Sequence, residues 1–239
     1  MSIRTRIERL QISVWRFLHP SERTQKVLYR GFTLVESLVA IWFLTLAIVA
    51  PMSLASQSLN SAYYSRDQIV AFQLAQEGIE SVRQIRDDNT LSKIYNGCPD
   101  DVFSGDPACP GSLSIPINQS FIIDTIHNWT YTDFSGAGCT GGNPPPVRVD
   151  STGTFYGYGT DPGNTKMANV CATPGGWGPT NFTRKLTAQV ISCNDGTPAS
   201  PCAVGSHDEL LITVTVTWST SGVAHTLVIA EDLYNWERL

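Results

Sequence analysis

Residues 37–65 form a run of 29 uncharged residues between Glu36 and Arg66, and the first two-thirds of this run are strongly apolar. About 20 apolar residues in a helix are enough to span a bilayer. The run therefore predicts a helix that starts at Phe32 and spans a membrane to about residue 53. Glu36 lies in the second turn of this expected helix. A carboxylate inside a spanning helix costs roughly 2.5–3.5 kcal/mol on insertion scales, so this acid needs a partner and is a candidate functional residue.

Charge is divided unevenly between the two sides of the apolar run. Residues 1–31 carry seven basic and two acidic side chains, a net charge of +5, and the whole 239-residue chain carries −5, so the remainder carries −10. A basic segment beside a membrane helix stays in the cytoplasm. We therefore expect a single-pass protein in the cytoplasmic membrane, with a basic cytoplasmic segment (residues 1–31) and everything after the helix outside. The acidic remainder lacks the basic stripe of nucleic-acid-binding proteins, so nucleic acid is not an expected partner.

The residues at the start of the expected helix follow a recognisable pattern. They read Gly31-Phe32-Thr33-Leu34-Val35-Glu36, followed by the apolar run. This pattern resembles the prepilin motif of type IV pilins and type II secretion pseudopilins. The resemblance implies that a prepilin peptidase cuts between Gly31 and Phe32 and that the new N-terminal Phe32 is N-methylated. It also implies that Glu36 pairs with the N-terminal amine of a neighbouring subunit during assembly. An ordinary signal anchor with a stray glutamate is the alternative.

The resemblance carries expectations about partners and location. The implied partners are other pilin or pseudopilin subunits, the prepilin peptidase, the membrane and an assembly platform. The mature protein would lie in a surface or periplasmic filament.

The apolar run continues into an amphipathic segment, so one long helix is expected over residues 32–90. Pro51 lacks a backbone N–H and predicts a kink. Gly78 is expected to weaken the helix by about 1 kcal/mol relative to alanine. Residues that recur at spacings of three and four, the pattern of one helix face, indicate the side that packs on the rest of the chain. They are Ile69, Phe72, Gln76, Ile79, Val82 and Ile85 or Arg86.

Residues 91–239 are expected to form a β-rich domain outside the membrane. In residues 209–218 apolar and threonine side chains alternate, which is typical of a strand with one buried face. A loop at residues 219–222 would connect this strand to the next in a hairpin. Expected strands are Ser112–Ile117, Ser120–Ile126, Trp129–Phe134, Lys185–Ser192, Glu209–Trp218 and Val223–Ala230. The predicted fold is α+β and pilin-like, with the long N-terminal helix packed on a C-terminal antiparallel sheet of three to five strands.

All six cysteines follow the expected helix. They are Cys98, Cys109, Cys139, Cys171, Cys193 and Cys202. An even number of cysteines outside the cytoplasm predicts three disulfides. Six cysteines allow many pairings; proximity in sequence favours Cys98–Cys109 and Cys193–Cys202, which leaves Cys139–Cys171. No C-x-x-C spacing occurs, so a zinc site is not expected.

The sequence contains none of the common catalytic motifs, including H-E-x-x-H, G-x-S-x-G and the Walker glycine loop. We therefore expect no enzyme activity, no cofactor and no metal site. The acid-containing run at residues 207–209 is expected to be a solvated turn. Turns at residues 161–164 and 194–196 lack the several carboxylates that a calcium site needs.

Two further features of the β-rich region have alternative interpretations. Tyr156, Tyr158 and Trp177 lie in the loop region of residues 136–180. They form either a contact surface for a partner or packing residues under a loop. Sequons begin at Asn118, Asn128 and Asn181, and a chain rich in Asn, Ser and Thr can contain them by chance.

These features together predict a structural subunit of a type IV pilus or pseudopilus, cut after Gly31 and assembled through its apolar helix. The long leader and the irregular, cysteine-stapled domain favour a minor pilin. The alternative is an uncleaved, membrane-anchored binding module or enzyme outside the cytoplasm. The mass of the cell-derived protein separates the two, because only a processed subunit begins at Phe32.

Overall fold

The computed structural model describes residues 31, 33–97, 102–105, 113–134, 139, 142–159, 167, 169–172, 174–193 and 207–236. Within these ranges lie one α-helix, α2 (Leu34–Asn96), and eight strands in a five-stranded and a three-stranded sheet. A long N-terminal helix and a C-terminal antiparallel sheet confirm the α+β class. The chain divides into two compact units, residues 1–54 and 55–239. Helix α2 contributes to both, and each unit is described by itself.

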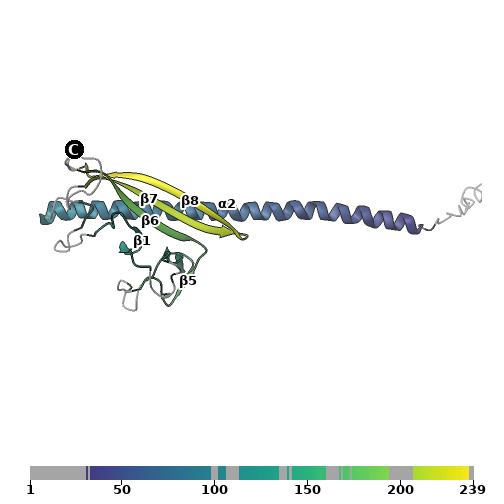
Figure 1. The fold of residues 1–239 in the computed structure, drawn as a ribbon. Helices are drawn as coiled ribbons and strands as arrows, with labels where there is room; N and C mark the ends of the chain where they lie inside the picture. The colour runs from purple at the N-terminus through teal and green to yellow at the C-terminus, as the bar shows by residue number, and fades with distance from the viewer. Residues whose placement is uncertain are drawn as a thin grey trace, which may run out of the picture. The chain divides into compact units, whose positions relative to one another are not determined.

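The larger sheet contains most of the strands that the sequence predicted. It has the order β2-β1-β6-β7-β8, and all of its neighbouring strands are antiparallel (Figure 1). Its strands are β1 (Ser120–Asp124), β2 (Trp129–Tyr131), β6 (Thr183–Cys193), β7 (His207–Thr220) and β8 (Val223–Tyr234). The strand expected over residues 112–117 is reduced to isolated bridges at Ser114 and Ile117.

The β7–β8 hairpin is tighter than the four-residue loop that the sequence predicted. Thr220 pairs directly with Val223, so only Ser221 and Gly222 lie in the turn. Both residues have positive φ, 53° and 81°. A two-residue hairpin turn with positive φ at both positions matches the right-handed twist of the strands.

Residues 55–96 of α2 lie along one face of the larger sheet, and the buried side chains of this part fall between Ala71 and Ser92 (Figure 1). The sheet presents the predicted apolar side chains of β7, since Ile212, Val214 and Val216 are fully buried. The predicted helix face was partly wrong, because Ile69 and Phe72 are 60% and 46% exposed. The buried side chains of the helix are Ala71, Leu74, Ala75, Gly78, Ile79, Ser81, Val82, Ile85, Asn89, Thr90 and Ser92. Small residues (Ala71, Ala75 and Gly78) dominate the N-terminal part of this face, which lets helix and sheet approach closely.

The smaller sheet lies in residues 136–180, for which the sequence predicts a long loop. Its strands are β3 (Arg148–Asp150), β4 (Tyr156–Gly157) and β5 (Trp177–Pro179), in the order β4-β3-β5. Strands of two or three residues carry too little alternation to be recognised by period. The sheet is joined to the larger one through backbone hydrogen bonds, including Val147 N to Phe182 O at 2.8 Å.

Candidate functional site

Thr33 caps the N-terminus of α2. Its carbonyl accepts the first intrahelical hydrogen bond, from Ser37 N at 3.1 Å, and its hydroxyl accepts a hydrogen bond from Glu36 N at 3.2 Å. These are the two bonds of an N-cap residue. Gly31 lies before the cap, outside the helix and exposed. Phe32, the predicted methylation site, lies outside the described residues.

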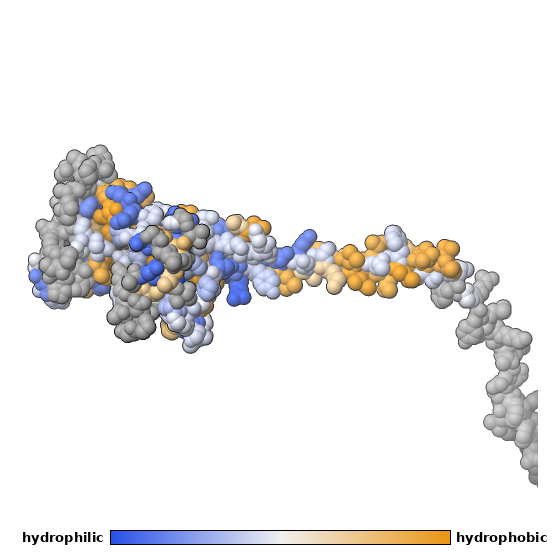
Figure 2. Space-filling view, turned by 60° about the horizontal axis from the view of Figure 1, so that its bottom comes forward, coloured by the Kyte–Doolittle hydropathy of each residue, from blue (hydrophilic) through white to orange (hydrophobic). Residues whose placement is uncertain are grey.

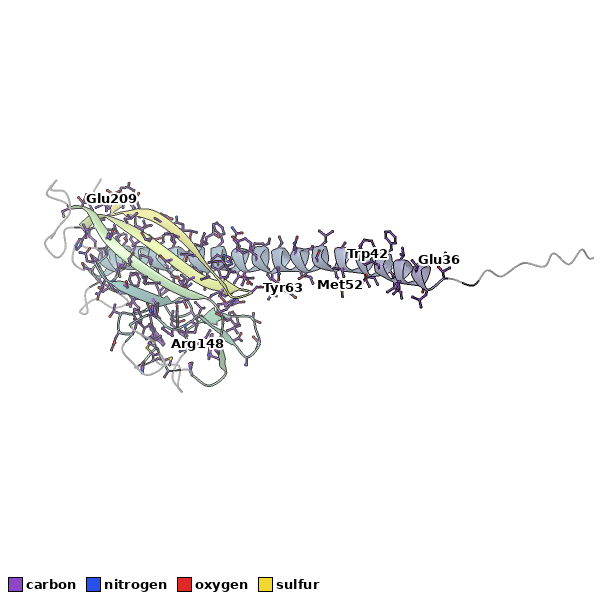
Figure 3. The ribbon with its side chains drawn as sticks, turned by 45° about the vertical axis from the view of Figure 1, so that its right-hand side comes forward. Glu36, Trp42, Met52, Tyr63, Arg148 and Glu209 are labelled. Atoms are coloured by element: carbon purple, nitrogen blue, oxygen red, sulfur yellow. A yellow bond between two sulfur atoms is a disulfide. The ribbon has the colours of Figure 1, made fainter. Side chains whose placement is uncertain are left out.

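Glu36 occupies the first turn of α2 rather than the second, since the helix begins at Leu34 (Figure 3). Thr33 and Glu36 also have the T-x-x-E spacing of a capping box, a helix-start signal that is present in the sequence itself. A carboxylate at this end of a helix is also favoured by the helix dipole. Glu36 is exposed, and it has no ion-pair partner within the described part of the chain. The acid therefore lies where the helix dipole favours a negative charge, and that charge has no ion-pair partner among the described residues.

Residues 34–54 of α2 expose apolar side chains around the whole helix. Every described side chain in this range is exposed, and the range is hydrophobic over the face seen in Figure 2. Large examples are Trp42, Phe43, Leu44 and Met52, at 60–71% exposure. The segment is long and apolar enough to cross a membrane. It is thus compatible with membrane anchoring. A helix that is apolar all round is stable only when surrounded by lipid or other apolar surfaces.

The hydroxyl groups inside this apolar segment are satisfied by the helix itself. Ser37, Thr45 and Ser53 each donate to the carbonyl three residues earlier, at 2.9, 2.8 and 3.0 Å. Such bonds remove the need for water in an apolar environment. Pro51 lies inside α2. The kink predicted there stays a prediction.

Arg184 of β6 fastens the second half of α2 to the sheet. The side chain is fully buried. Its guanidinium donates to Leu74 O at 3.0 Å, to Glu77 Oε2 at 3.2 Å and to Ile123 O at 2.8 Å. One side chain thereby joins the helix, β6 and β1. Nothing in the sequence marks this arginine, which lies at a core position of an alternating strand.

The β7–β8 hairpin turn makes a second contact with α2, nearer the start of this unit. Thr220 donates a hydrogen bond to Asp67 at 2.7 Å, and Ser221 donates to Asn60 at 3.3 Å. Beside them the ring of Tyr64 lies 4.8 Å from that of His225. The sheet is therefore held to the helix at two places, around residues 60–67 and around residues 74–77.

The predicted Cys139–Cys171 disulfide is present and closes the region around the smaller sheet. Cys193 is also disulfide-bonded, but the pairs proposed for Cys98, Cys109 and Cys202 involve residues outside the described ranges. The buried Arg148 (Figure 3) donates to Tyr158 O at 2.7 Å and to Val170 O at 2.9 Å, beside this disulfide. Desolvation lowers the pKa of Arg148.

The aromatic residues of this region divide between packing and exposure. Tyr158 is fully buried, and burial raises its pKa to about 12, so it is a packing residue rather than a contact surface. Tyr156 and Trp177 are half-buried. Tyr156 pairs with Val149 and Trp177 pairs with Asp150, so both aromatic residues lie on strands that flank β3.

The remaining candidates from the sequence do not assemble into a reactive centre within the described residues. Residues 207–209 begin β7 and are not the solvated turn that was predicted. His127 contacts buried Asp124 at 2.8 Å, an arrangement within the β1–β2 turn. The turns at residues 161–164 and 194–196 lie outside the described ranges. Grouped metal-ligating side chains are absent from the described residues.

Two of the three sequon asparagines have a conformational role. Asn118 and Asn128 have positive φ, 57° and 54°, in tight turns beside β1 and β2. Asparagine tolerates this left-handed region better than most residues. The structure therefore explains these two asparagines without glycosylation.

Comparison with known proteins adds no relative, because no family model, curated protein or solved structure matches this chain. The functional interpretation depends on the residues of this chain alone.

Proposed function

We propose that this protein is a structural subunit of a type IV pilus or pseudopilus, and a minor pilin rather than the main subunit. It is made as a membrane precursor, cut after Gly31 and assembled through residues 34–54 of α2. The observation that carries this proposal is an apolar helix segment whose described side chains are all exposed. Its first turn contains an acid that lacks an ion-pair partner among the described residues. The protein acts by assembly and not as an enzyme.

The position of Gly31 favours cleavage at this point. A peptidase needs an extended, accessible backbone, and a bond within a hydrogen-bonded helix is protected. Gly31 is exposed, precedes the cap at Thr33, and has no heavy atom within 4 Å of the place where a Cβ would lie. The bond after Gly31 therefore precedes the first hydrogen-bonded turn of α2.

Cleavage creates a positive charge, the new amine of Phe32, that can pair with the Glu36 carboxylate. The new amine of Phe32 would be a cation at the positive end of the helix dipole, where a cation is unfavourable. A carboxylate four residues along the same helix can offset that charge, and so can one on a neighbouring chain. Pairing between chains also compensates the burial of Glu36 when apolar helices pack together, since a buried charge must be paired. Assembly would thus depend on both the cut and the acid.

The capping box provides the sharpest test of this role. Glutamine also serves at the N3 position of a capping box, so Glu36→Gln keeps the cap and removes the charge. We expect Glu36→Gln to insert into the membrane and be cleaved normally but to be strongly depleted from sheared filaments, measured by immunoblot against the membrane pool. Glu36→Leu should be depleted to a similar degree.

Thr33→Ala is the matched control, because it weakens the cap by about 1 kcal/mol and keeps the charge. It should enter filaments far better than Glu36→Gln. The opposite order, with normal incorporation of Glu36→Gln and loss of Thr33→Ala, would show that Glu36 serves only the helix start. Normal incorporation of both variants would also contradict the proposed ion pair.

A further inference from the structure

The face of the larger sheet that points away from α2 contains an open cavity of about 370 Å³. It is lined by Thr183 and Lys185 of β6, by Thr215 and Thr217 of β7, and by Asn143 and Pro144. The four strand residues are cross-strand neighbours, since Thr183 pairs with Thr217 and Lys185 with Thr215. The volume lies within the range of small-molecule pockets, about 300–1,000 Å³.

The described residues around this cavity carry charge of one sign. Among the six described residues that line it, Lys185 is the only charged one. The neighbours of Thr215 and Thr217 on β8 are Val228 and Thr226, which are uncharged. The closest acid of β8 on this face is Asp232, opposite Leu211, four residues along β7 from Thr215 and so about 14 Å away. A single ammonium thus stands among hydroxyl groups in a domain of net negative charge.

The side-chain donors of the cavity floor have no hydrogen-bond partner among the described residues. The Lys185 ammonium and the hydroxyls of Thr183, Thr215 and Thr217 form no hydrogen bond or ion pair with other described residues. On two paired β-strands these side chains stand roughly perpendicular to the sheet and present their donors toward the same space. Ammonium and hydroxyl donors in one place match the oxygens of a carboxylate or phosphate.

The cavity wall is held in position by the backbone. Next to Asn143 and Pro144, Val147 N donates to Phe182 O at 2.8 Å, and Thr180 N donates to Val147 O at 3.0 Å. The wall is therefore tied to the residues that lead directly into β6. A floor of paired strands and an anchored wall mean that little ordering is needed when a ligand binds.

We propose that this cavity binds a small molecule through a carboxylate or phosphate group, with Lys185 as the charge partner. Thr183, Thr215 and Thr217 donate hydrogen bonds to the same oxygens. This binding site is separate from the assembly role of α2 and does not depend on it.

The test is a titration of the full-length chain in non-ionic detergent micelles, with methyl-labelled threonine observed by NMR. The probes are inorganic phosphate and acetate, each at constant ionic strength balanced with sodium chloride. Saturable shifts are expected for the methyl signals of Thr183, Thr215 and Thr217. Thr213 is the internal control, since it lies on the same strand and face as Thr215 but does not line the cavity.

Two substitutions complete the test. Lys185→Met should weaken the binding at least tenfold, while Lys185→Arg should retain most of it. Thr215→Val should weaken binding more than Thr213→Val, which keeps the result interpretable if Lys185→Met fails to fold. Saturation by phosphate alone or acetate alone would support the site and define the ligand group. The absence of saturable shifts with both anions, or unchanged binding in Lys185→Met and Thr215→Val, would overturn the proposal.

Discussion

The first half of α2 (residues 34–54) and its second half (residues 55–96) are both helical, but their surroundings are opposite. Leu44 in the first half is 60% exposed, whereas Leu74 in the second half is 3% exposed. The second half has its partner within the chain, because the sheet covers its inner face and Arg184 bonds to its backbone. The first half has large apolar side chains on every side, and all of its described side chains are exposed. The apolar side chains of the second half are therefore buried within the chain, whereas those of the first half need lipid or another chain to cover them.

The chemistry of the side chains differs accordingly. Facing the sheet, α2 has Ala71, Ala75 and Gly78, which allow close packing within one chain. Residues 34–54 instead have bulky residues pointing outward, which suit lipid or neighbouring helices. A substitution on the sheet-facing side should therefore leave residues 34–54 unchanged, and a substitution within residues 34–54 should leave the folded domain unchanged.

The largest expected effect comes from Arg184, which links the second half of α2 to two strands. Arg184→Ala should lower the free energy of unfolding by about 3–5 kcal/mol, since the change leaves buried acceptors and the Glu77 carboxylate without their donor. Denaturant unfolding of the full chain in micelles measures this loss. Arg83→Ala is the control, because Arg83 pairs with Glu80 and Glu231 near the surface and should cost at most about 1 kcal/mol. Equal losses in the two variants would contradict the account of Arg184.

The next effect concerns the Cys139–Cys171 disulfide, which closes a separation of 32 residues. Replacing both cysteines with serine should cost about 3–4 kcal/mol by the loop-entropy argument. The loss should appear first as faster hydrogen exchange in β3 and β5, measured by mass spectrometry. Membrane insertion of residues 34–54 should be unchanged. Altered insertion would show that this segment depends on the folded β-rich domain.

A matched pair of leucines compares the two halves directly. Leu74→Ala removes a buried side chain and should lower the stability of the domain by about 2–5 kcal/mol. Leu44→Ala is the same substitution in the same helix and should change domain stability by less than about 0.5 kcal/mol. Denaturant unfolding measures both, and a large loss from Leu44→Ala would mean that residues 34–54 stabilise the folded domain.

The smallest effect is expected at Gly78. A Cβ there would lie 3.4 Å from Arg184 Cδ and 3.5 Å from Val214 Cγ1, which are ordinary contacts. Gly78→Ala should therefore fit and stabilise the helix by up to about 1 kcal/mol. Gly78→Leu should destabilise the domain, because the larger side chain must displace Arg184 or Val214. Thermal unfolding distinguishes these outcomes, and a destabilised Gly78→Ala would show tighter helix–sheet packing than the distances indicate.

The sequence predicted the parts of the fold that have a long, regular period. The apolar run predicted α2, and the alternation of Ile212, Val214 and Val216 predicted β7. The helix–sheet face was harder, because large apolar residues dominate a periodicity count while Ala71 and Ala75 make the contact. The smaller sheet could not be predicted, since its strands are too short to show alternation.

Among the candidate functional residues too, those with a local sequence pattern could be predicted and those that depend on tertiary contacts could not. Gly31 and Glu36 were found because their residue types are unusual at fixed offsets from an apolar run. Arg184 was missed because a buried arginine is stabilised by carbonyls from distant segments, which only the tertiary structure brings together. The cavity around Lys185 depends on the register of β6 and β7, and the sequence of one strand does not reveal it.

The mass of the protein isolated from cells that make it, with sequencing of its N-terminus, tests the central claim most directly. The account predicts a chain that begins at Phe32, carries an N-methyl group and lacks residues 1–31. A chain that still begins at Met1 in cells with an active prepilin peptidase would contradict it, and would favour an uncleaved membrane-anchored module.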